Sequence, residues 1–271
     1  MPTRPELPPT RALVWLYTPA AQRETFAALC GIEAEISASL NPRIEHQVAH
    51  ARLAWWGEEC ARTALGAPTH PLTRALGASL AGADLTALAG LAGFVATARW
   101  DLAAATCETR AQLGAYCQRW AHAMITPLVP STLGAAASRL GATLHEIQLL
   151  AHLAEDARLG RLRVTLADLA AASAAPQDLA RPPWPHGLVR VLRLRHQQLR
   201  AELAAGVGEL PRLNQPTLAG LLVWARLAAA HSQRSERALP HALEPRDHHG
   251  PLDSWRAWST ARRAAAGRFA L

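Results

Sequence analysis

Residues 145–169 read HEIQLLAHLAEDARLGRLRVTLADL, and this stretch decides the fold. In it an apolar helical pattern ends in Glu155 and Asp156, and arginines follow on either side of Gly160. Carboxylates at a helix end beside arginines supply the groups that bind Mg²⁺ and a diphosphate. The alternative is an ordinary helix end, in which Arg158 complements the helix dipole and Gly160 forms the C-cap. Taken alone, the residues favour the ordinary helix end, because such ends are common.

The rest of the chain has the same helical character. Few residues are β-branched, and no Asn-Gly or Asp-Gly pair marks a hairpin turn. Phe26, Leu29 and Ile32 recur at three-residue spacing, which places them on one face of a helix. No fixed-period repeat is present, so we predict an all-α, single-domain helical bundle. The predicted helices cover about 18–40, 43–65, 72–79, 85–105, 110–128, 131–156, 166–174, 188–205, 215–237 and 253–269.

The composition predicts a folded chain and excludes several chemistries. Half of the 271 residues are hydrophobic, which is enough to bury a core and excludes disorder for most of the chain. The formal net charge is +7, and every basic residue is an arginine. The absence of lysine excludes a Schiff-base lysine, a P-loop lysine and a Ser-Lys dyad.

The cysteines and histidines give no strong metal or redox signal. The four cysteines form no CxxC pair, so we expect reduced thiols in a cytoplasmic protein. His46 and His50 lie four apart on a predicted helix, but the sequence places no third metal ligand with them. The N-terminus lacks the apolar core of a secretory signal, and no apolar run is long enough for a membrane span. We therefore expect a soluble or membrane-peripheral protein.

Residues 145–169 also resemble a family motif. They are similar to the second Asp-rich region of the squalene/phytoene synthase family, roughly D-V-x-E-D-x-R-x-G-R-x-Y-L-P. Residues 25–40 resemble the first Asp-rich helix of that family, and 52–76 resemble its W-W/R-E-E…G-x-P-x-H-P…A-L segment. Residues 101–124 resemble its D-L…E-L…Y-C helix, and the whole resemblance covers about 13–237.

The resemblance implies a fold and a chemistry. The fold is the all-α class I isoprenoid synthase bundle. Active members of the family join two prenyl diphosphates head to head, with Mg²⁺ held between two facing Asp-rich helices. On this reading Arg158, Arg161 and Tyr116 are the candidate diphosphate-binding residues. Mg²⁺ is the implied cofactor if the protein is such a transferase, and none is expected otherwise.

The chain departs from the family pattern at the metal-binding positions. Where the first motif reads D-D-x-x-D, residues 34–38 read AEISA, so that Ala34 and Ala38 replace aspartates. His152 replaces the leading aspartate of the second motif. Arg163 stands where the family has the tyrosine of Y-L-P. A class I metal cluster needs several oxygen ligands, so these replacements remove most of it.

The departures lead to two functional hypotheses. The first is a non-catalytic or repurposed family member with an assembly or isoprenoid-binding role, similar to the mitochondrial complex I assembly factors of this group. The second is an active head-to-head prenyltransferase that makes a squalene- or phytoene-type product. In that case Mg²⁺ would bind through Glu35, Glu155 and Asp156. Glu33 is predicted to share the helix face of Ile32, so it does not simply replace a lost aspartate.

The C-terminal end supports two interpretations. We expect a flexible N-terminus over 1–12, the helical domain over 13–237, a linker over 238–252 and a basic helix over 253–271. That helix combines Trp255 and Trp258 with four arginines, as interfacial helices do. Alternatively, the two tryptophans pack on the bundle and the arginines face water.

The basic charge does not predict a specific nucleic-acid partner. Arginines of the 188–205 helix alternate with leucine and valine, which is typical of an amphipathic helix with a solvated basic face. The partners we expect are an isoprenoid or lipid ligand, a protein partner, and a membrane surface contacted through 253–271.

Overall fold

The computed structural model describes residues 7–80, 85–243 and 250–271. Their regular structure is entirely helical, which confirms the predicted all-α class. The α-helices are α1 (Pro9–Tyr17), α2 (Arg23–Ala38), α3 (His46–Ala64), α4 (Pro71–Ser79), α5 (Ala92–Leu102), α6 (Arg110–Met124), α7 (Gly134–Ala151), α8 (Leu153–Arg158), α9 (Leu166–Ala172), α10 (His186–Gly208), α11 (Ala219–Ala238) and α12 (Pro251–Ala265). Short 3₁₀ helices lie at Ala20–Gln22, Leu85–Leu91, Thr126–Leu128, Ser131–Leu133, Pro176–Ala180 and Arg212–Asn214.

Three elements differ from the helices predicted from the sequence. Helix α1 was not predicted, because prolines crowd its start; proline in the first turn costs no helical hydrogen bond, so the helix forms there. The helix predicted over 85–105 begins as a 3₁₀ helix and becomes α5. The helix predicted over 131–156 is interrupted at His152, which ends α7 and precedes α8.

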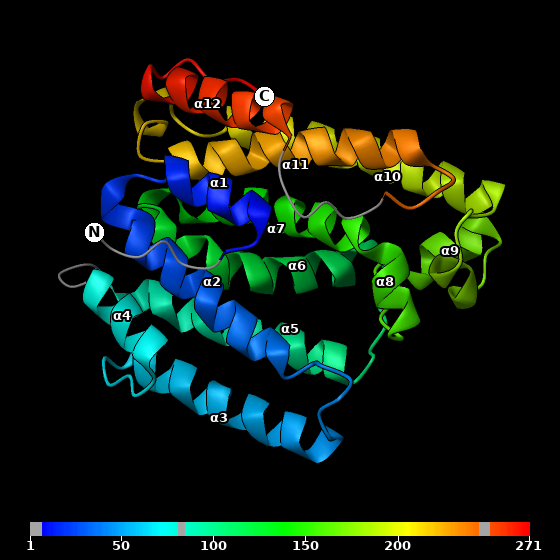
Figure 1. The fold of residues 1–271 in the computed structure, drawn as a ribbon, viewed down its shortest axis with the longest axis horizontal. Coiled ribbons are helices and arrows are strands. Elements are labelled where there is room, and N and C mark those ends of the chain that lie inside the picture. Colours follow the sequence, from blue (N-terminus) through cyan, green and yellow to red (C-terminus); the bar gives the residue numbers. More distant parts are fainter. Residues whose placement is uncertain (1–6, 81–84, 244–249) are drawn as a thin grey trace.

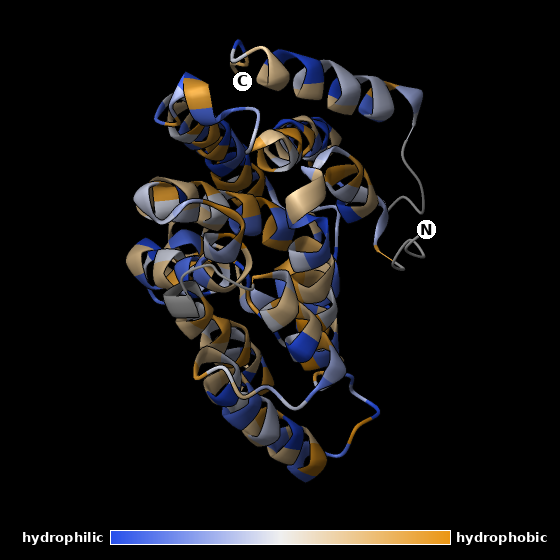
Figure 2. Ribbon diagram, turned by 90° about the vertical axis from the view of Figure 1, so that its left-hand side faces the viewer, coloured by the Kyte–Doolittle hydropathy of each residue, from blue (hydrophilic) through white to orange (hydrophobic). Residues whose placement is uncertain are grey.

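The helices form a stack of antiparallel and crossing neighbours (Figure 1). Helices α6 and α7 pack against each other in the middle of the molecule. Helices α2 and α5 lie on one side of this pair, with α3 and α4 beyond them, and α10 and α11 lie on the other side. Figure 2 shows apolar and polar residues interleaved along nearly every helix, as expected when each helix buries one stripe.

The apolar stripe predicted for α2 lies in the core. Phe26, Leu29, Ile32 and Ile36 are all at most 1% exposed. Phe26 packs edge-on against Trp224 of α11, with ring centroids 6.0 Å apart, so α2 is tied to the far side of the bundle. This packing fixes the face that α2 turns inward.

Helix α12 docks on α11 and α1 through a face of small residues (Figure 1). Ala257 and Ala264 are fully buried, and Asp253 accepts hydrogen bonds from Arg234 at 2.9 Å and Arg256 at 2.8 Å. Of the two interpretations of this helix, the structure shows docking on the bundle, but through alanines rather than through the tryptophan pair, because Trp255 and Trp258 are 59% and 46% exposed. Among the described residues, no helix is both long enough and apolar enough to cross a bilayer.

Candidate functional site

A buried arginine binds the acidic residue at the end of α8. Arg163 donates from Nε to Asp156 at 2.7 Å, and from Nη1 and Nη2 to the two carboxylate oxygens of Asp101 at 2.7 and 3.0 Å. The Tyr116 hydroxyl lies 3.1 Å from both Asp101 oxygens and accepts a hydrogen bond from Arg163 at 3.2 Å. Arg161 lies 3.8 Å from Asp156 and donates to the backbone of α2's C-terminal turn. We call Asp101, Tyr116, Asp156 and Arg163 the Arg163 cluster.

The charges of the Arg163 cluster are fixed by its burial and hydrogen bonds. Burial opposes the charged guanidinium, but the hydrogen bonds and charges of Asp101 and Asp156 outweigh it and raise the pKa of Arg163. Burial, the largest influence, raises the pKa of the Tyr116 hydroxyl well above its ordinary value. The cluster therefore holds a permanent cation and a neutral phenol between two carboxylates at neutral pH.

A second internal cation, Arg11, lies beside the first motif. Glu33 of α2 forms an ion pair with Arg11 of α1 and accepts a hydrogen bond from Trp120 Nε1 at 2.6 Å. The Arg11 guanidinium also lies over the Trp224 ring, 5.7 Å from its centroid. Arg11 remains charged because Glu33 offsets the penalty of its burial, which raises the pKa of Arg11 overall. Glu33 is thus already paired inside the bundle.

The three altered positions of the first motif lie at the surface. Glu35 is about half exposed and lies 3.9 Å from the guanidinium of Arg52 of α3. Ala34 and Ala38 are exposed, so their methyl groups do not fill the interior. A surface ion pair of this length contributes little to stability.

Three other residues of the second motif, His152, Glu155 and Arg158, lie at the surface. His152 and Glu155 are exposed and lie 3.4 Å apart. Arg158 is exposed and has no hydrogen-bond or ion-pair partner among the described residues. The structure therefore joins Tyr116, Asp156 and Arg161 in one region, but it separates Arg158 and Glu155 from them.

The arrangement does not fit a Mg²⁺-diphosphate centre. Of the candidate metal ligands only Asp156 reaches the interior, and it already binds an arginine, as do the neighbouring Asp101 and Glu33. Glu35 and Glu155 have separate partners on the surface. Within the described ranges no group of three or more His, Cys, Asp or Glu side chains is placed to hold a metal ion. Because Mg²⁺ requires oxygen ligands arranged around one point, these carboxylates do not form its shell.

Two residues of these networks were missed by sequence reasoning. Asp101 and Arg11 lie 62 and 22 positions from their partners along the chain, so no local spacing indicates the pairing. One signal was present: Arg163 replaces the tyrosine of the family motif, and a buried arginine requires nearby carboxylates.

The space between α2, α6 and α7 contains stacked rings. The His145 ring lies 4.3 Å from the Trp120 ring with an interplanar angle of 6°, and 5.8 Å from Tyr116. Burial, with the charges of Arg163 and Arg11 nearby, holds the pKa of His145 well below its ordinary value. His145 is therefore a neutral packing residue at physiological pH, without the charge needed to bind a diphosphate.

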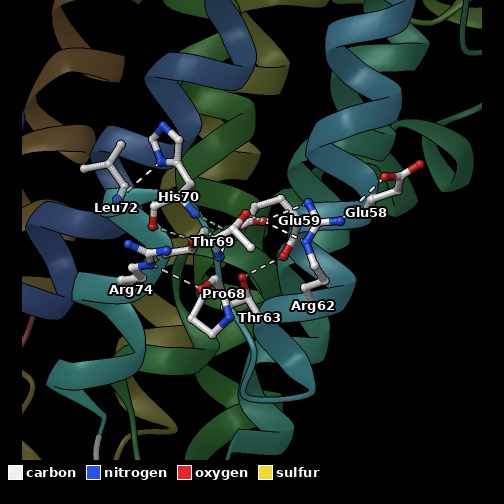
Figure 3. A network of polar contacts seen from close by, with 10 residues as sticks. Glu58, Glu59, Arg62, Thr63, Pro68, Thr69, His70, Leu72 and Arg74 are labelled. Atoms are coloured by element: carbon white, nitrogen blue, oxygen red, sulfur yellow. Dashed lines mark hydrogen bonds and ion pairs between the residues drawn. The ribbon is translucent and has the colours of Figure 1, made fainter.

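The segments that match W-W-x-E-E (residues 55–59) and P-x-H-P (residues 68–71) are held together by hydrogen bonds to one carboxylate (Figure 3). Glu59 of α3 is fully buried and accepts hydrogen bonds from the backbone N–H groups of Thr69 and His70 at 2.7 and 2.8 Å. The Thr69 and Thr73 hydroxyls each donate to it at 2.5 Å, and Arg62 donates at 2.9 Å. One carboxylate thereby joins α3 to the start of α4, and we call these residues the Glu59 network.

Comparisons with known proteins agree with this architecture. The sequence model for "Squalene/phytoene synthase" matches residues 8–257. A dehydrosqualene synthase solved in complex with a ligand aligns with a TM-score of 0.75 and 15% identity, over 95% of this chain and 90% of that one. The squalene synthase HpnC from Alicyclobacillus acidocaldarius aligns with a TM-score of 0.65 and 20% identity, over 83% of this chain and 87% of that one. Among curated proteins, no sequence matches. The family match spans most of the chain, so the protein belongs to the squalene/phytoene synthase family.

Proposed function

We propose that this protein is a non-catalytic or repurposed member of its family, retained for an assembly or isoprenoid-binding role. The observation that carries the proposal is the pairing of Arg163 with both Asp101 and Asp156. The guanidinium of an arginine stays protonated at any physiological pH, and it is attached to the chain. Its charge therefore always competes with a metal cation for these carboxylates.

The chemistry of the family explains why this pairing matters. Departure of a diphosphate from a prenyl chain requires several cations that neutralise the developing charge. Freeing Asp156 for a metal would leave the buried Arg163 guanidinium with one partner fewer, and breaking a buried ion pair costs about 3–5 kcal/mol. Metal binding would have to offset that cost before any ionisation began. The geometry therefore supports loss of the metal-dependent step.

A prenyl-transfer assay tests the proposal directly. We expect no product from farnesyl or geranylgeranyl diphosphate in the presence of Mg²⁺ and NADPH, measured by extraction and chromatography of the hydrocarbon products. Turnover that Asp156→Ala abolishes would overturn the proposal and support the alternative, an active Mg²⁺-dependent prenyltransferase. The matched control is Asp178→Ala, because Asp178 only caps a short helix through the Ala175 N–H at 2.8 Å.

A second candidate role is peripheral membrane binding through α12. The helix buries its alanine face on the bundle and leaves Leu252, Trp255 and Trp258 exposed. Arg262 lies over the Trp258 ring, 5.1 Å from its centroid, so a cation accompanies the aromatic surface. Tryptophans beside arginines suit the boundary between anionic headgroups and acyl chains. We propose an anionic membrane surface as the partner of this face.

Vesicle binding separates this role from a purely structural one. We expect Trp255→Ala combined with Trp258→Ala to weaken binding to anionic phosphatidylglycerol vesicles by about tenfold or more, because two large side chains lose their apolar contact. Co-sedimentation measures the effect, and Leu213→Ala is the control, because Leu213 is 93% exposed on a different segment. Unchanged binding of the double variant would contradict the membrane role. Deletion of 252–271 is a weaker test, because it also removes the buried contacts of Asp253 and Phe269.

A further inference from the structure

Helices α11 and α12 pack side by side, with α12 on the outside of the bundle (Figure 1). Arg234, near the end of α11, donates a hydrogen bond to Asp253 at the start of α12 at 2.9 Å. Further back along α11, Val223 and Leu227 pack with Ala257 of α12. The two helices therefore run antiparallel, with the middle of α11 opposite the middle of α12. This register determines which polar side chains meet at the edge of the contact.

Three arginines gather at this edge. Arg226 directly precedes Leu227 on α11 and is partly buried. Arg256 and Arg263 are seven residues apart on α12, which places them on the same side of that helix. They lie close enough to act on Arg226, because partial burial, and after it the charges of these two residues, holds the pKa of Arg226 below its ordinary value. We call Arg226, Arg256 and Arg263 the Arg226 cluster.

The positive charge of the Arg226 cluster is only partly neutralised. Arg226 and Arg263 form no hydrogen bond or ion pair with any described residue. Arg256 donates to Asp253 at 2.8 Å, but Asp253 is shared with Arg234. Like charges held close together repel one another, so an anion that binds between them is attracted and also relieves their repulsion. The cluster therefore has the charge of an anion-binding site.

A phosphate group suits the Arg226 cluster better than a carboxylate does. Guanidinium groups donate paired hydrogen bonds to phosphate oxygens in a fixed planar geometry. A phosphomonoester supplies three acceptor oxygens and a charge of about −1.5 to −2 at pH 7. A carboxylate supplies two oxygens and a single charge, so it satisfies fewer of the available donors. A phosphodiester also carries a single charge, because its second ester bond removes one ionisable oxygen.

The place of the cluster on α12 favours a phosphate at a membrane surface. Arg256 and Arg263 lie on the flank of α12 between its buried alanine face and the exposed Trp255. If the tryptophans of α12 rest at the boundary between headgroups and acyl chains, these arginines reach the level of the lipid phosphates. Arg226 then approaches the same phosphates from α11.

We propose that the Arg226 cluster binds the phosphate group of a phosphomonoester, which Arg226 and Arg263 hold from the two helices while Arg256 donates its remaining N–H groups. A lipid source for this phosphate rests on the membrane role proposed above for α12, whereas the phosphate site itself does not. The cluster lies on α11 and α12, away from the acidic motifs on α2 and α8.

Vesicle binding tests the site with a lipid phosphate. Phosphatidylcholine vesicles carry either phosphatidic acid, a monoester, or phosphatidylglycerol, a diester, at mole fractions that give equal surface charge. We expect about fivefold tighter binding to the phosphatidic acid vesicles, measured by co-sedimentation. Arg226→Gln should remove this preference. The matched control is Arg193→Gln, which removes the same charge from an exposed position on α10 and should keep the preference.

Calorimetric titration with glycerol 3-phosphate tests the same site without a membrane. We expect a dissociation constant of about 1 mM, which Arg226→Gln and Arg263→Gln each raise about fivefold. Binding of glycerol 3-phosphate as tight as that of the vesicles would support the site with a soluble phosphomonoester as its ligand. A preference for phosphatidic acid without binding of glycerol 3-phosphate would support it with a lipid ligand.

Two results would overturn the proposal. One is the absence, in both arms, of any phosphomonoester binding that Arg226→Gln weakens. The other is an equal loss in Arg193→Gln, because the effect would then follow net charge alone. Thermal unfolding is the folding control: Arg226→Gln should melt no lower than the unaltered protein, since Arg226 pairs with no described carboxylate.

Failure of the membrane role can be distinguished from failure of the phosphate site. If replacing Trp255 and Trp258 leaves binding to phosphatidylglycerol vesicles unchanged, the membrane role is wrong, and the titration with glycerol 3-phosphate still tests the cluster. If that replacement weakens binding but Arg226→Gln alters neither arm, the membrane role stands and the phosphate site is wrong.

Discussion

Arg163→Met is expected to destabilise the protein by about 3–5 kcal/mol, because it leaves Asp101 buried without a cation and Asp156 with only the more distant Arg161, 3.8 Å away. Asp101 and Asp156 have side chains only 9% and 14% exposed, and Arg163 is the residue that bridges them. Urea unfolding followed by circular dichroism measures the loss. The melting temperature should fall by about 10 °C, since one kcal/mol corresponds to about 2–4 °C in a chain of this size.

Two further variants identify the cause of that loss. Arg163→Met combined with Asp101→Asn and Asp156→Asn should recover part of the stability, because the uncompensated charges are gone. Arg139→Met is the matched control: Arg139 and its partner Glu209 are 60% and 49% exposed, so its loss should change stability by less than about 1 kcal/mol. If Arg163→Met costs no more than Arg139→Met, Arg163 is not the counterion of the two aspartates.

The sequence predicted the core of the fold better than the site. The apolar stripe of α2 is visible as residue spacing, and Phe26, Leu29 and Ile32 are buried as that spacing requires. Hydrophobic periodicity is a property of a single helix, so it can be recognised without knowing which other helices pack against that helix. The interruption at His152 was not predicted, because no glycine or proline marks it in the sequence.

The charge pairs could not be predicted for a related reason. Arg163 and Asp101 lie 62 residues apart, and Arg11 and Glu33 lie on different helices. Ion-pair partners are selected by tertiary packing, whereas a sequence motif records only which residue types are present. The sequence therefore shows that aspartates are missing at Ala34 and Ala38. It does not show which arginines bind the carboxylates that remain.

Glu59→Gln is expected to destabilise the protein by about 3 kcal/mol at neutral pH, because the amide places a donor opposite groups that also donate. Glu59 accepts hydrogen bonds from Thr69, His70 and Arg62 (Figure 3). It also accepts one from the Thr73 hydroxyl. Burial acts to raise its pKa, but these hydrogen bonds outweigh burial and lower the pKa to about 2. Urea unfolding at pH 7 measures the loss, with Glu58→Gln as the control on the same helix, since Glu58 is 71% exposed.

The pH dependence of the same variant tests the mechanism. The pKa of Glu59 is about 2 in the folded protein and 4.5 in the unfolded chain, so its contribution is complete above pH 4.5 and is lost as pH falls toward 2. This loss amounts to about 3 kcal/mol for a shift of that size. Glu59→Gln lacks the titrating group, so the gap between the two proteins should narrow steadily from pH 5 to pH 2. A gap that stays constant over this range would show that Glu59 stabilises the α3–α4 junction by packing alone, because a charge-based contribution must disappear when the carboxylate is protonated.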